Sequence, residues 1–246
     1  MPRPPQILAT SGGLAARPGV RAVDRGGLMN EAIRLADVTG RPAKICGLFT
    51  AVGDDARTTA MWYDAVGAAG DVFSSHVAVF DMPNHADYRA HLLAQDVVWV
   101  CGGSTANLLA LWRLHHLDEI MRECWEAGIV LTGVSAGSLC WHLGGTTDSF
   151  GLELQPITDG LGFLPYSNCP HYDGEEQRRP LYQKLVGDGT LPAGYATDNG
   201  VGLHYVGTEL VDVVREYPNE EVAAYRVEPD GDGTAKETRL EARLVS

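Results

Sequence analysis

Ser135 is the residue of this sequence best placed to act as a nucleophile. It lies at the centre of Gly133-Val134-Ser135-Ala136-Gly137, a G-x-S-x-G pattern in which a strained turn exposes a serine hydroxyl between a strand and a helix. The apolar run from Ile129 to Gly133 predicts the strand, and the residues after the serine predict the helix. The N–H group of Ala136 would stabilise an oxyanion at the helix N-terminus. The pattern therefore predicts acyl-transfer chemistry, with a plain tight turn as the alternative.

A serine nucleophile needs a general base within hydrogen-bond reach. His171 is the favoured candidate among the eight histidines, because it follows Pro170 in a polar loop, Ser167 to Gly174, after a predicted strand. His142 falls about two turns into the helix predicted after the serine. A packing or capping role is expected for His142.

Two aspartates are candidates for the third member of a catalytic triad, which orients the base. Asp148 follows two threonines and could equally cap a turn. Asp198 precedes an Asn-Gly pair in a hairpin predicted between Tyr195 and Tyr205, and it could equally set up that turn. We favour Asp198, because a separate strand beside the one that delivers His171 can bring it to the side of the imidazole away from the nucleophile.

A glycine-rich turn, Cys101-Gly102-Gly103-Ser104-Thr105, follows the strand predicted for Asp96 to Val100. A backbone N–H of Gly102 or Gly103 is the expected second oxyanion donor, because a side chain there would crowd the substrate. Ser11-Gly12-Gly13 is a similar turn after the first strand. Its spacing differs from G-x-G-x-x-G, so ordinary loop geometry is favoured there over phosphate binding.

Strands and helices alternate along the first part of the chain. This rhythm predicts βαβ units, and therefore a mostly parallel sheet with helices on both faces. Active sites of such sheets lie at the carboxyl ends of the strands, so Ser135 and the Gly102-Gly103 turn should face the same crevice. Antiparallel strands are expected late in the chain. The strands predicted before the elbow are Gln6 to Thr10, Ala43 to Thr50, Val72 to Phe80 and Asp96 to Val100, and the late ones are Thr208 to Glu216 and Ala223 to Val227.

Composition limits the classes of partner. The formal charge of −13 argues against nucleic acid and anionic membranes. The five cysteines are odd in number, scattered and without metal-ligand spacing, as in reduced intracellular proteins. No apolar run approaches the roughly 18 residues of a membrane span. A chain of 246 residues suits one α/β domain, so we expect a single-domain cytoplasmic protein without a metal.

Several segments together resemble the peptidase E family of serine peptidases, which includes cyanophycinase. Val98 to Leu109 resembles the family's strand followed by G-G-G-N-T and a helix, and Gly133 to Gly137 resembles its G-x-S-A-G elbow. T-T-D at 146–148 resembles a T-T-N-D-like segment, P-H-Y at 170–172 resembles P-H-F, and E-Q-R at 176–178 has a counterpart as well. The resemblance covers roughly residues 96 to 205.

The resemblance implies a three-layer α/β/α fold related to class I glutamine amidotransferase domains. It also implies that Ser135 is the nucleophile and His171 the base, without a cofactor. The acidic member of the triad is placed at either of two positions in the family, and they correspond here to Asp148 and Asp198. Where related enzymes carry glutamate at the second position, this chain has the shorter aspartate. Relatives also suggest a homodimer.

Substrate recognition is expected to involve residues on both sides of the elbow. Relatives cleave after an N-terminal aspartate or release aspartate-arginine units. Arg178 is the expected partner of that carboxylate, with Arg179 as the second choice, and an ordinary exposed helix face is the alternative for both arginines. Ser104 and Thr105 are also assigned to substrate binding. Cys101 and Ser104 depart from G-G-G-N-T, so the backbone donors are kept but any contact of the asparagine side chain is lost.

The expected function is that of a serine dipeptidase or exopeptidase with a small peptide substrate and a preference for N-terminal aspartate. An esterase of the α/β-hydrolase type is one alternative, and His204 would then have to serve as the base. A catalytically idle binding or regulatory module on the same fold is the other, because the changes at Cys101 and Ser104 could have relaxed the oxyanion geometry.

Overall fold

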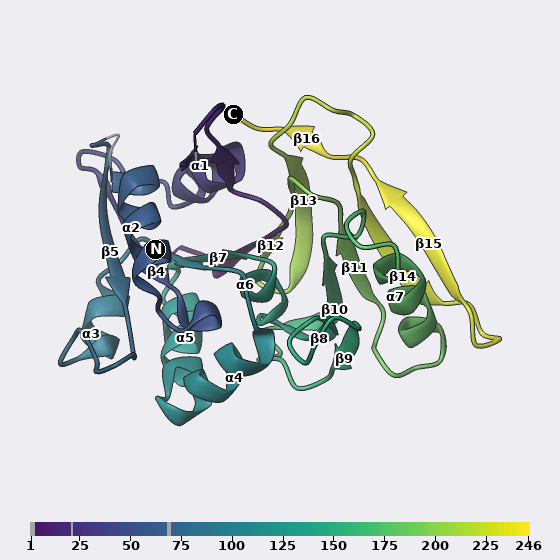
Figure 1. Cartoon of the computed structure of the whole chain (residues 1–246). Helices are drawn as coiled ribbons and strands as arrows, with labels where there is room; N and C mark the ends of the chain where they lie inside the picture. Colours follow the sequence, from purple (N-terminus) through teal and green to yellow (C-terminus); the bar gives the residue numbers. More distant parts are fainter. Residues whose placement is uncertain (1–2, 21, 68–69) are drawn as a thin grey trace.

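The computed structural model describes residues 3–20, 22–67 and 70–246, and its strands lie mainly in two sheets (Figure 1). The larger sheet has eight strands in the order β16-β13-β12-β1-β7-β6-β4-β5. The run from β1 to β5 is parallel, whereas β12 and β13 are antiparallel to their neighbours on the β1 side. The strands are β1 Gln6–Thr10, β4 Ala43–Leu48, β5 Val72–Val77, β6 Val97–Val100, β7 Val130–Val134, β12 Val201–Val206, β13 Glu209–Arg215 and β16 Arg243–Leu244.

The second sheet has six strands in the order β15-β14-β11-β10-β8-β9. Its centre, β8, β10 and β11, is parallel, and its outer strands are antiparallel to their neighbours. The strands are β8 His142–Thr147, β9 Gln155–Ile157, β10 Leu164–Pro170, β11 Gly194–Thr197, β14 Ala224–Pro229 and β15 Ala235–Leu240, and a separate ribbon pairs β2 Leu14–Ala16 with β3 Val23–Arg25. The sequence predicts one central sheet, and this is wrong: most strands after Ser135 build a second sheet.

Helices accompany both sheets, and α7 packs against β14 and β15 of the smaller one (Figure 1). The helical region after β6 is interrupted between α4 and α5 at His116, whose φ of 56° is left-handed. None of the helices in the described residues is long and apolar enough to cross a membrane. The helices are α1 Gly27–Leu35, α2 Ala56–Trp62, α3 Tyr88–Leu93, α4 Thr105–Leu114, α5 Leu117–Glu126, α6 Ala136–Leu139 and α7 Arg178–Gly187, with short turns η1 Thr50–Val52 and η2 Tyr63–Gly67.

The central strands of the larger sheet are buried on both faces. All residues of β1 and β6 are buried, which agrees with their nearly continuous apolar sequences. Trp99 of β6 stacks on Trp62 of α2 with ring centroids 5.1 Å apart. This core fixes the carboxyl ends of β6 and β7, where the candidate site begins.

His142 begins strand β8 and does not continue a helix, which corrects the sequence prediction. The strand packs so closely that a Cβ on Gly145 would lie 1.9 Å from the carbonyl oxygen of Asn168 in β10. The absence of a side chain at Gly145 therefore permits this close strand pairing. His142 is fully buried, its Nδ1 lies 3.0 Å from the carbonyl oxygen of Ser138, and burial lowers its pKa to about 4. It is a neutral packed residue, as expected.

The segment from Tyr195 to Tyr205 is not a hairpin. Strand β11 pairs with β10 and β14 in the smaller sheet, and β12 pairs with β1 and β13 in the larger one. The Asn199-Gly200 turn, with a left-handed φ of 80° at Gly200, carries the chain from one sheet to the other. The Asn-Gly turn thus forms as expected, but the two strands that flank it pair with other strands and not with each other.

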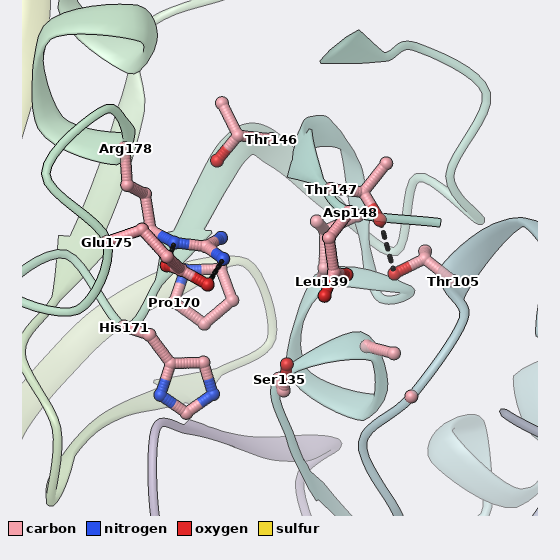
Figure 2. A pocket seen from close by; sticks show the side chains of 12 residues that line it. Thr105, Ser135, Leu139, Thr146, Thr147, Asp148, Pro170, His171, Glu175 and Arg178 are labelled. Atoms are coloured by element: carbon pink, nitrogen blue, oxygen red, sulfur yellow. Dashed lines mark hydrogen bonds and ion pairs between the residues drawn. The ribbon is translucent and has the colours of Figure 1, made fainter. Parts of the chain in front are cut away.

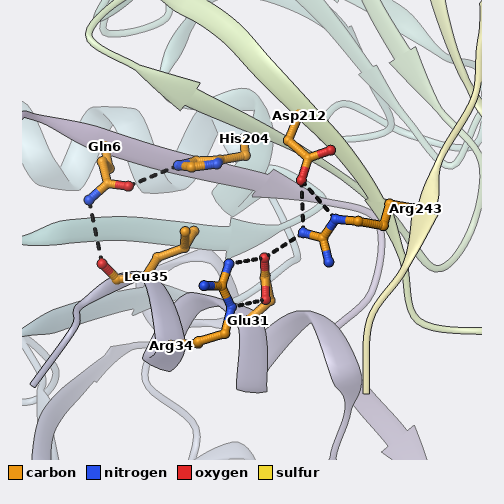
Figure 3. Close-up of polar contacts among 7 residues, drawn as sticks. All are labelled: Gln6, Glu31, Arg34, Leu35, His204, Asp212 and Arg243. Carbon is orange, nitrogen blue, oxygen red and sulfur yellow. Dashed lines mark hydrogen bonds and ion pairs between the residues drawn. The ribbon is translucent and has the colours of Figure 1, made fainter.

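A cluster of polar residues ties the last strand to the first helix (Figure 3). Glu31 of α1 is only 5% exposed and accepts hydrogen bonds from Arg34 at 2.7 Å and from Arg243 of β16 at 2.9 Å. Arg243 also binds Asp212 of β13 at 2.7 Å. Because a buried carboxylate needs such partners, the cluster anchors β16 on the sheet.

Candidate active site

Ser135 occupies a strained corner between β7 and α6. Its φ of 58° and ψ of −112° are unfavourable for any residue with a side chain. The neighbouring glycines are required by close backbone approach: a Cβ on Gly133 would lie 2.4 Å from the carbonyl oxygen of Gly137, and a Cβ on Gly137 would lie 2.2 Å from that of Val100. The predicted nucleophile elbow is therefore formed as the G-x-S-x-G pattern requires.

A cavity of about 230 Å³ opens at this corner, and Ser135 and His171 both line it. They lie on facing sides of the cavity (Figure 2). Within the described residues no hydrogen bond joins the hydroxyl to the imidazole; such contacts are commonly loose before substrate binds. The lining residues are Gly103, Thr105, Ser135, Ala136, Leu139, Thr146, Thr147, Asp148, Pro170, His171, Glu175 and Arg178.

His171 follows β10 of the smaller sheet, with a left-handed φ of 56°. Its backbone N–H donates to Oγ of Ser11 at 3.0 Å, and that hydroxyl also contacts Oγ1 of Thr197 at 2.7 Å. Its ring nitrogen Nδ1 lies 2.6 Å from Oδ1 of Asn199. Ser11, at the end of β1, thus joins the larger sheet to the segments that carry the histidine.

The two aspartates proposed for the triad have other surroundings. Oδ2 of Asp198 accepts hydrogen bonds from the N–H of Ala223 at 2.9 Å and from the hydroxyl of Tyr225 at 3.3 Å, and burial raises its pKa. Asp148 is exposed and lines the cavity beside Leu139 (Figure 2). Asp148 and His171 thus line the same cavity. The hydrogen-bond partner of Nδ1 of His171, however, is Asn199 and not either aspartate.

The glycines assigned to the oxyanion hole lie next to Ser135. A Cβ on Gly102 would lie 3.1 Å from Cβ of Ser135, and a Cβ on Gly103 would lie 2.4 Å from the carbonyl oxygen of Ala51. Gly103 has a φ of 133°, which favours glycine, and it lines the cavity together with Ala136. The backbone of two separate turns therefore comes together beside Ser135.

The neighbours of these glycines have distinct roles. Oγ of Ser104 accepts the N–H of Asn107 at 3.2 Å and caps α4, whereas Thr105 is buried and lines the cavity. Cys101 is buried and its pKa is raised by burial to about 12, so a thiolate nucleophile is excluded there. Among the described residues, no group of histidine, cysteine, aspartate and glutamate could hold a metal ion.

Among the described residues that line the cavity, Arg178 is the one with a permanent positive charge, and it forms an ion pair with Glu175. Nε and Nη2 of the arginine donate to the two carboxylate oxygens at 2.5 and 2.9 Å (Figure 2). The arginine side chain is 6% exposed and the glutamate side chain 49%. Burial lowers the pKa of Arg178, but the hydrogen bond and charge of Glu175 together with nearby Cys169 and Asp148 raise the pKa on balance. The same pair lowers the pKa of Glu175. Arg179 binds Glu237 on another face of α7.

The Ser11-Gly12-Gly13 turn does hold an anion, but the anion belongs to the chain. Glu216 accepts the N–H groups of Gly13 at 3.0 Å and of Leu28 at 3.3 Å, near the start of α1. Burial raises the pKa of this carboxyl group. A glutamate side chain therefore occupies the glycine-rich turn. This agrees with the prediction of ordinary loop geometry, which the sequence favours over phosphate binding.

Glu175, Asn199 and Glu216 were not singled out from the sequence. Asn199 and Glu216 are common surface residue types whose roles depend on long-range contacts with His171 and Gly13. The sequence signal for Glu175 is its spacing of i, i+3 from Arg178. For Asn199, the available signal is only that it stands next to a favoured aspartate.

The fold and the site together define an α/β protein with a serine at a nucleophile elbow, facing a histidine across a small cavity. The sequence model of Peptidase family S51 matches residues 27–213, and the chain belongs to this family of serine peptidases. The predicted resemblance to peptidase E is confirmed.

Individual relatives agree with this assignment. The chain is 39% identical over 225 residues to the uncharacterized peptidase YgaJ of Bacillus subtilis, covering 90% of this chain and 91% of that one. It is 29% identical over 144 residues to peptidase E of Shewanella amazonensis, covering 55% of this chain and 61% of that one.

Solved structures show the same fold. A peptidase from an acI-B1 Actinobacterium superposes with a TM-score of 0.67 at 16% identity, covering 97% of this chain and 95% of that chain. A putative peptidase E of Listeria monocytogenes superposes with a TM-score of 0.57 at 17% identity, covering 85% of this chain and 98% of that chain.

The structure also argues against the α/β-hydrolase alternative, in which His204 would be the base. His204 lies in β12, and its Nε2 is hydrogen-bonded to Gln6 at 2.9 Å.

Proposed function

We propose that this chain cleaves short peptides by acyl-enzyme chemistry with Ser135 as nucleophile and His171 as general base. The observation that carries the proposal is the strained Ser135 facing His171 across one cavity (Figure 2). His171 removes the hydroxyl proton as Oγ attacks the amide carbonyl, and the amides of Ala136 and of Gly102 or Gly103 bind the oxyanion. The imidazolium then protonates the leaving amine. A water molecule, deprotonated by His171, releases the acyl group from Ser135.

The size of the cavity supports a small substrate. Its volume of about 230 Å³ is below the roughly 300 to 1,000 Å³ of pockets that hold drug-sized ligands. Both sheets contribute residues to its walls, including Ser135 from the larger and Pro170 from the smaller. A dipeptide or the first residue of a peptide suits such a space, so we assign a dipeptidase or exopeptidase activity.

A preference for N-terminal aspartate is the finer part of the proposal. Arg178 is held almost fully buried, and its guanidinium already binds one carboxylate, that of Glu175. A guanidinium that holds a carboxylate with two nitrogens has the geometry needed for a substrate carboxylate. Glu175 is half exposed and follows a loop, so a substrate aspartate could take its place on Arg178.

The proposal is tested with a fluorophosphonate probe and two chromogenic substrates. The probe should modify wild-type protein at Ser135 and leave Ser135→Ala unmodified; absence of labelling in the wild type would favour an idle binding module. Aspartyl-p-nitroanilide should be cleaved faster than a short-chain p-nitrophenyl ester. Ser135→Ala and His171→Ala should abolish amide cleavage with little change in Tm, and wild-type turnover in His171→Ala would reject the base assignment.

A further inference from the structure

We infer that Asn199, held by Asp173, is the residue that positions His171. Oδ1 of Asn199 lies 2.6 Å from Nδ1 of the imidazole. Asn199 in turn donates its backbone N–H at 2.7 Å and its side-chain Nδ2–H at 2.9 Å to Oδ1 of Asp173. The three side chains thus form a chain of hydrogen bonds that ends on a carboxylate. The consequence for catalysis rests on the proposed function, in which His171 is the base.

The carboxylate of Asp173 determines which way the amide of Asn199 faces. A carboxylate only accepts hydrogen bonds, so it selects the NH2 group and leaves the amide oxygen toward the imidazole. An amide oxygen is also only an acceptor, so Nδ1 of a neutral His171 must carry the proton. Nε2 is then unprotonated, and it is the nitrogen turned toward Ser135 (Figure 2). Only this tautomer can take the proton of the serine hydroxyl.

The backbone explains why Asn199 and not Asp198 has this role. Both residues follow the end of β11 at Thr197, and their side chains contact different parts of the molecule. Asp198, just after β11, is buried and binds the N–H of Ala223 in the smaller sheet. Its neighbour Asn199 is exposed and reaches His171. The position that the sequence favours is therefore one residue away from the group that contacts the imidazole.

The tautomer of His171 can be measured without a substrate. Long-range 1H–15N spectra of the full chain should show a protonated Nδ1 and a bare Nε2 for His171, with its signals identified by their loss in His171→Ala. Asn199→Ala and Asp173→Asn should both move His171 toward the Nε2–H form, because the first removes the acceptor and the second frees the amide to rotate. An unchanged tautomer in both variants would overturn the inference.

Kinetics give the second readout. Asn199→Ala should lower kcat about 10-fold, as expected for the loss of one hydrogen bond that orients a base, and should leave KM within about 2-fold. Asp198→Asn is the matched comparison, because it changes the adjacent residue. If Asp198→Asn alters the tautomer and kcat while Asn199→Ala alters neither, Asp198 is the positioning residue and the inference fails. If the two variants shift the tautomer of His171 but the wild type has no peptidase activity, the positioning role of Asn199 is supported and the proposed function is rejected.

Discussion

Glu175 should compete with an acidic substrate for Arg178, and Glu175→Gln exposes that competition. The side chain of Arg178 is buried, so its guanidinium cannot exchange Glu175 for water, whereas the side chain of Glu175 is 49% exposed and can become hydrated. Replacing the carboxylate by an amide removes the charge of the internal partner and keeps its shape. The guanidinium then faces the cavity with its full positive charge, which favours a substrate carboxylate.

The size of the effect follows from the burial of the pair. An ion pair with one buried and one half-exposed partner is worth about 1 to 2 kcal/mol, between the values for surface and buried pairs. That free energy corresponds to an occupancy ratio of about 5 to 30, and the apparent affinity for a competing ligand falls by the same factor. Glu175→Gln should therefore lower KM for an N-terminal aspartyl substrate about 5- to 30-fold and leave KM for the alanyl analogue unchanged.

The assay compares aspartyl- and alanyl-p-nitroanilide in the two variants Glu175→Gln and Glu176→Gln. Glu176 is the neighbouring exposed carboxylate of the same loop, so its variant changes the net charge equally without touching Arg178. An equal fall of KM for both substrates in Glu175→Gln would show a general effect on the cavity. An unchanged aspartyl KM, or the same fall in Glu176→Gln, would refute the competition.

Three further predictions concern stability. Ser135→Gly should abolish amide cleavage but raise the free energy of unfolding by about 1 kcal/mol, because glycine accepts the φ of 58° without strain; a lower Tm than wild type would contradict the strain. Gly145→Ala should cost more than about 3 kcal/mol in urea unfolding, since its Cβ would lie 1.9 Å from a backbone oxygen of Asn168 that has no room to move. Hydrogen bonds from Arg34 and Arg243 lower the pKa of Glu31 below its ordinary 4.5, so its contribution is present above about pH 4.5 and is lost as pH falls through the folded-state pKa. Glu31→Gln should therefore have a lower Tm at pH 7 and a smaller loss of Tm between pH 5 and pH 3 than wild type.

Local patterns predicted the parts of the site that depend on short stretches of chain. The G-x-S-x-G spacing requires only a strand, a turn and close backbone packing, and Ser135 has the backbone strain that this pattern implies. The Gly102-Gly103 turn follows a continuous apolar strand and lies beside Ser135 as expected. The loop context favours His171 among the histidines, and the family resemblance implies the same residue.

Long-range pairing was not predictable from the same patterns. A hydrophobic strand does not specify its neighbour, so β11 and β12 resemble a hairpin although they belong to different sheets. The contacts of Asp198 and Asn199 depend on that pairing, because both residues lie in the connection that leads from β11 to β12. The residue that contacts the imidazole of His171 is therefore one position after the aspartate that the sequence favours, and its place at the junction between the sheets is a property of the tertiary structure.

That junction explains how two sheets share one site. Ser135 follows β7 of the larger sheet, and His171 follows β10 of the smaller one. Ser11, at the end of β1, accepts the N–H of His171 and contacts Thr197 of β11, while the turn at Asn199 continues into β12 beside β1. Both of these connections between the sheets end within a residue or two of His171 or of Asn199. The distance between Ser135 and His171 is set by contacts that hold the sheets together. Ser11→Ala, which removes the hydroxyl that makes these contacts, should therefore lower kcat although Ser11 is not one of the residues that line the cavity.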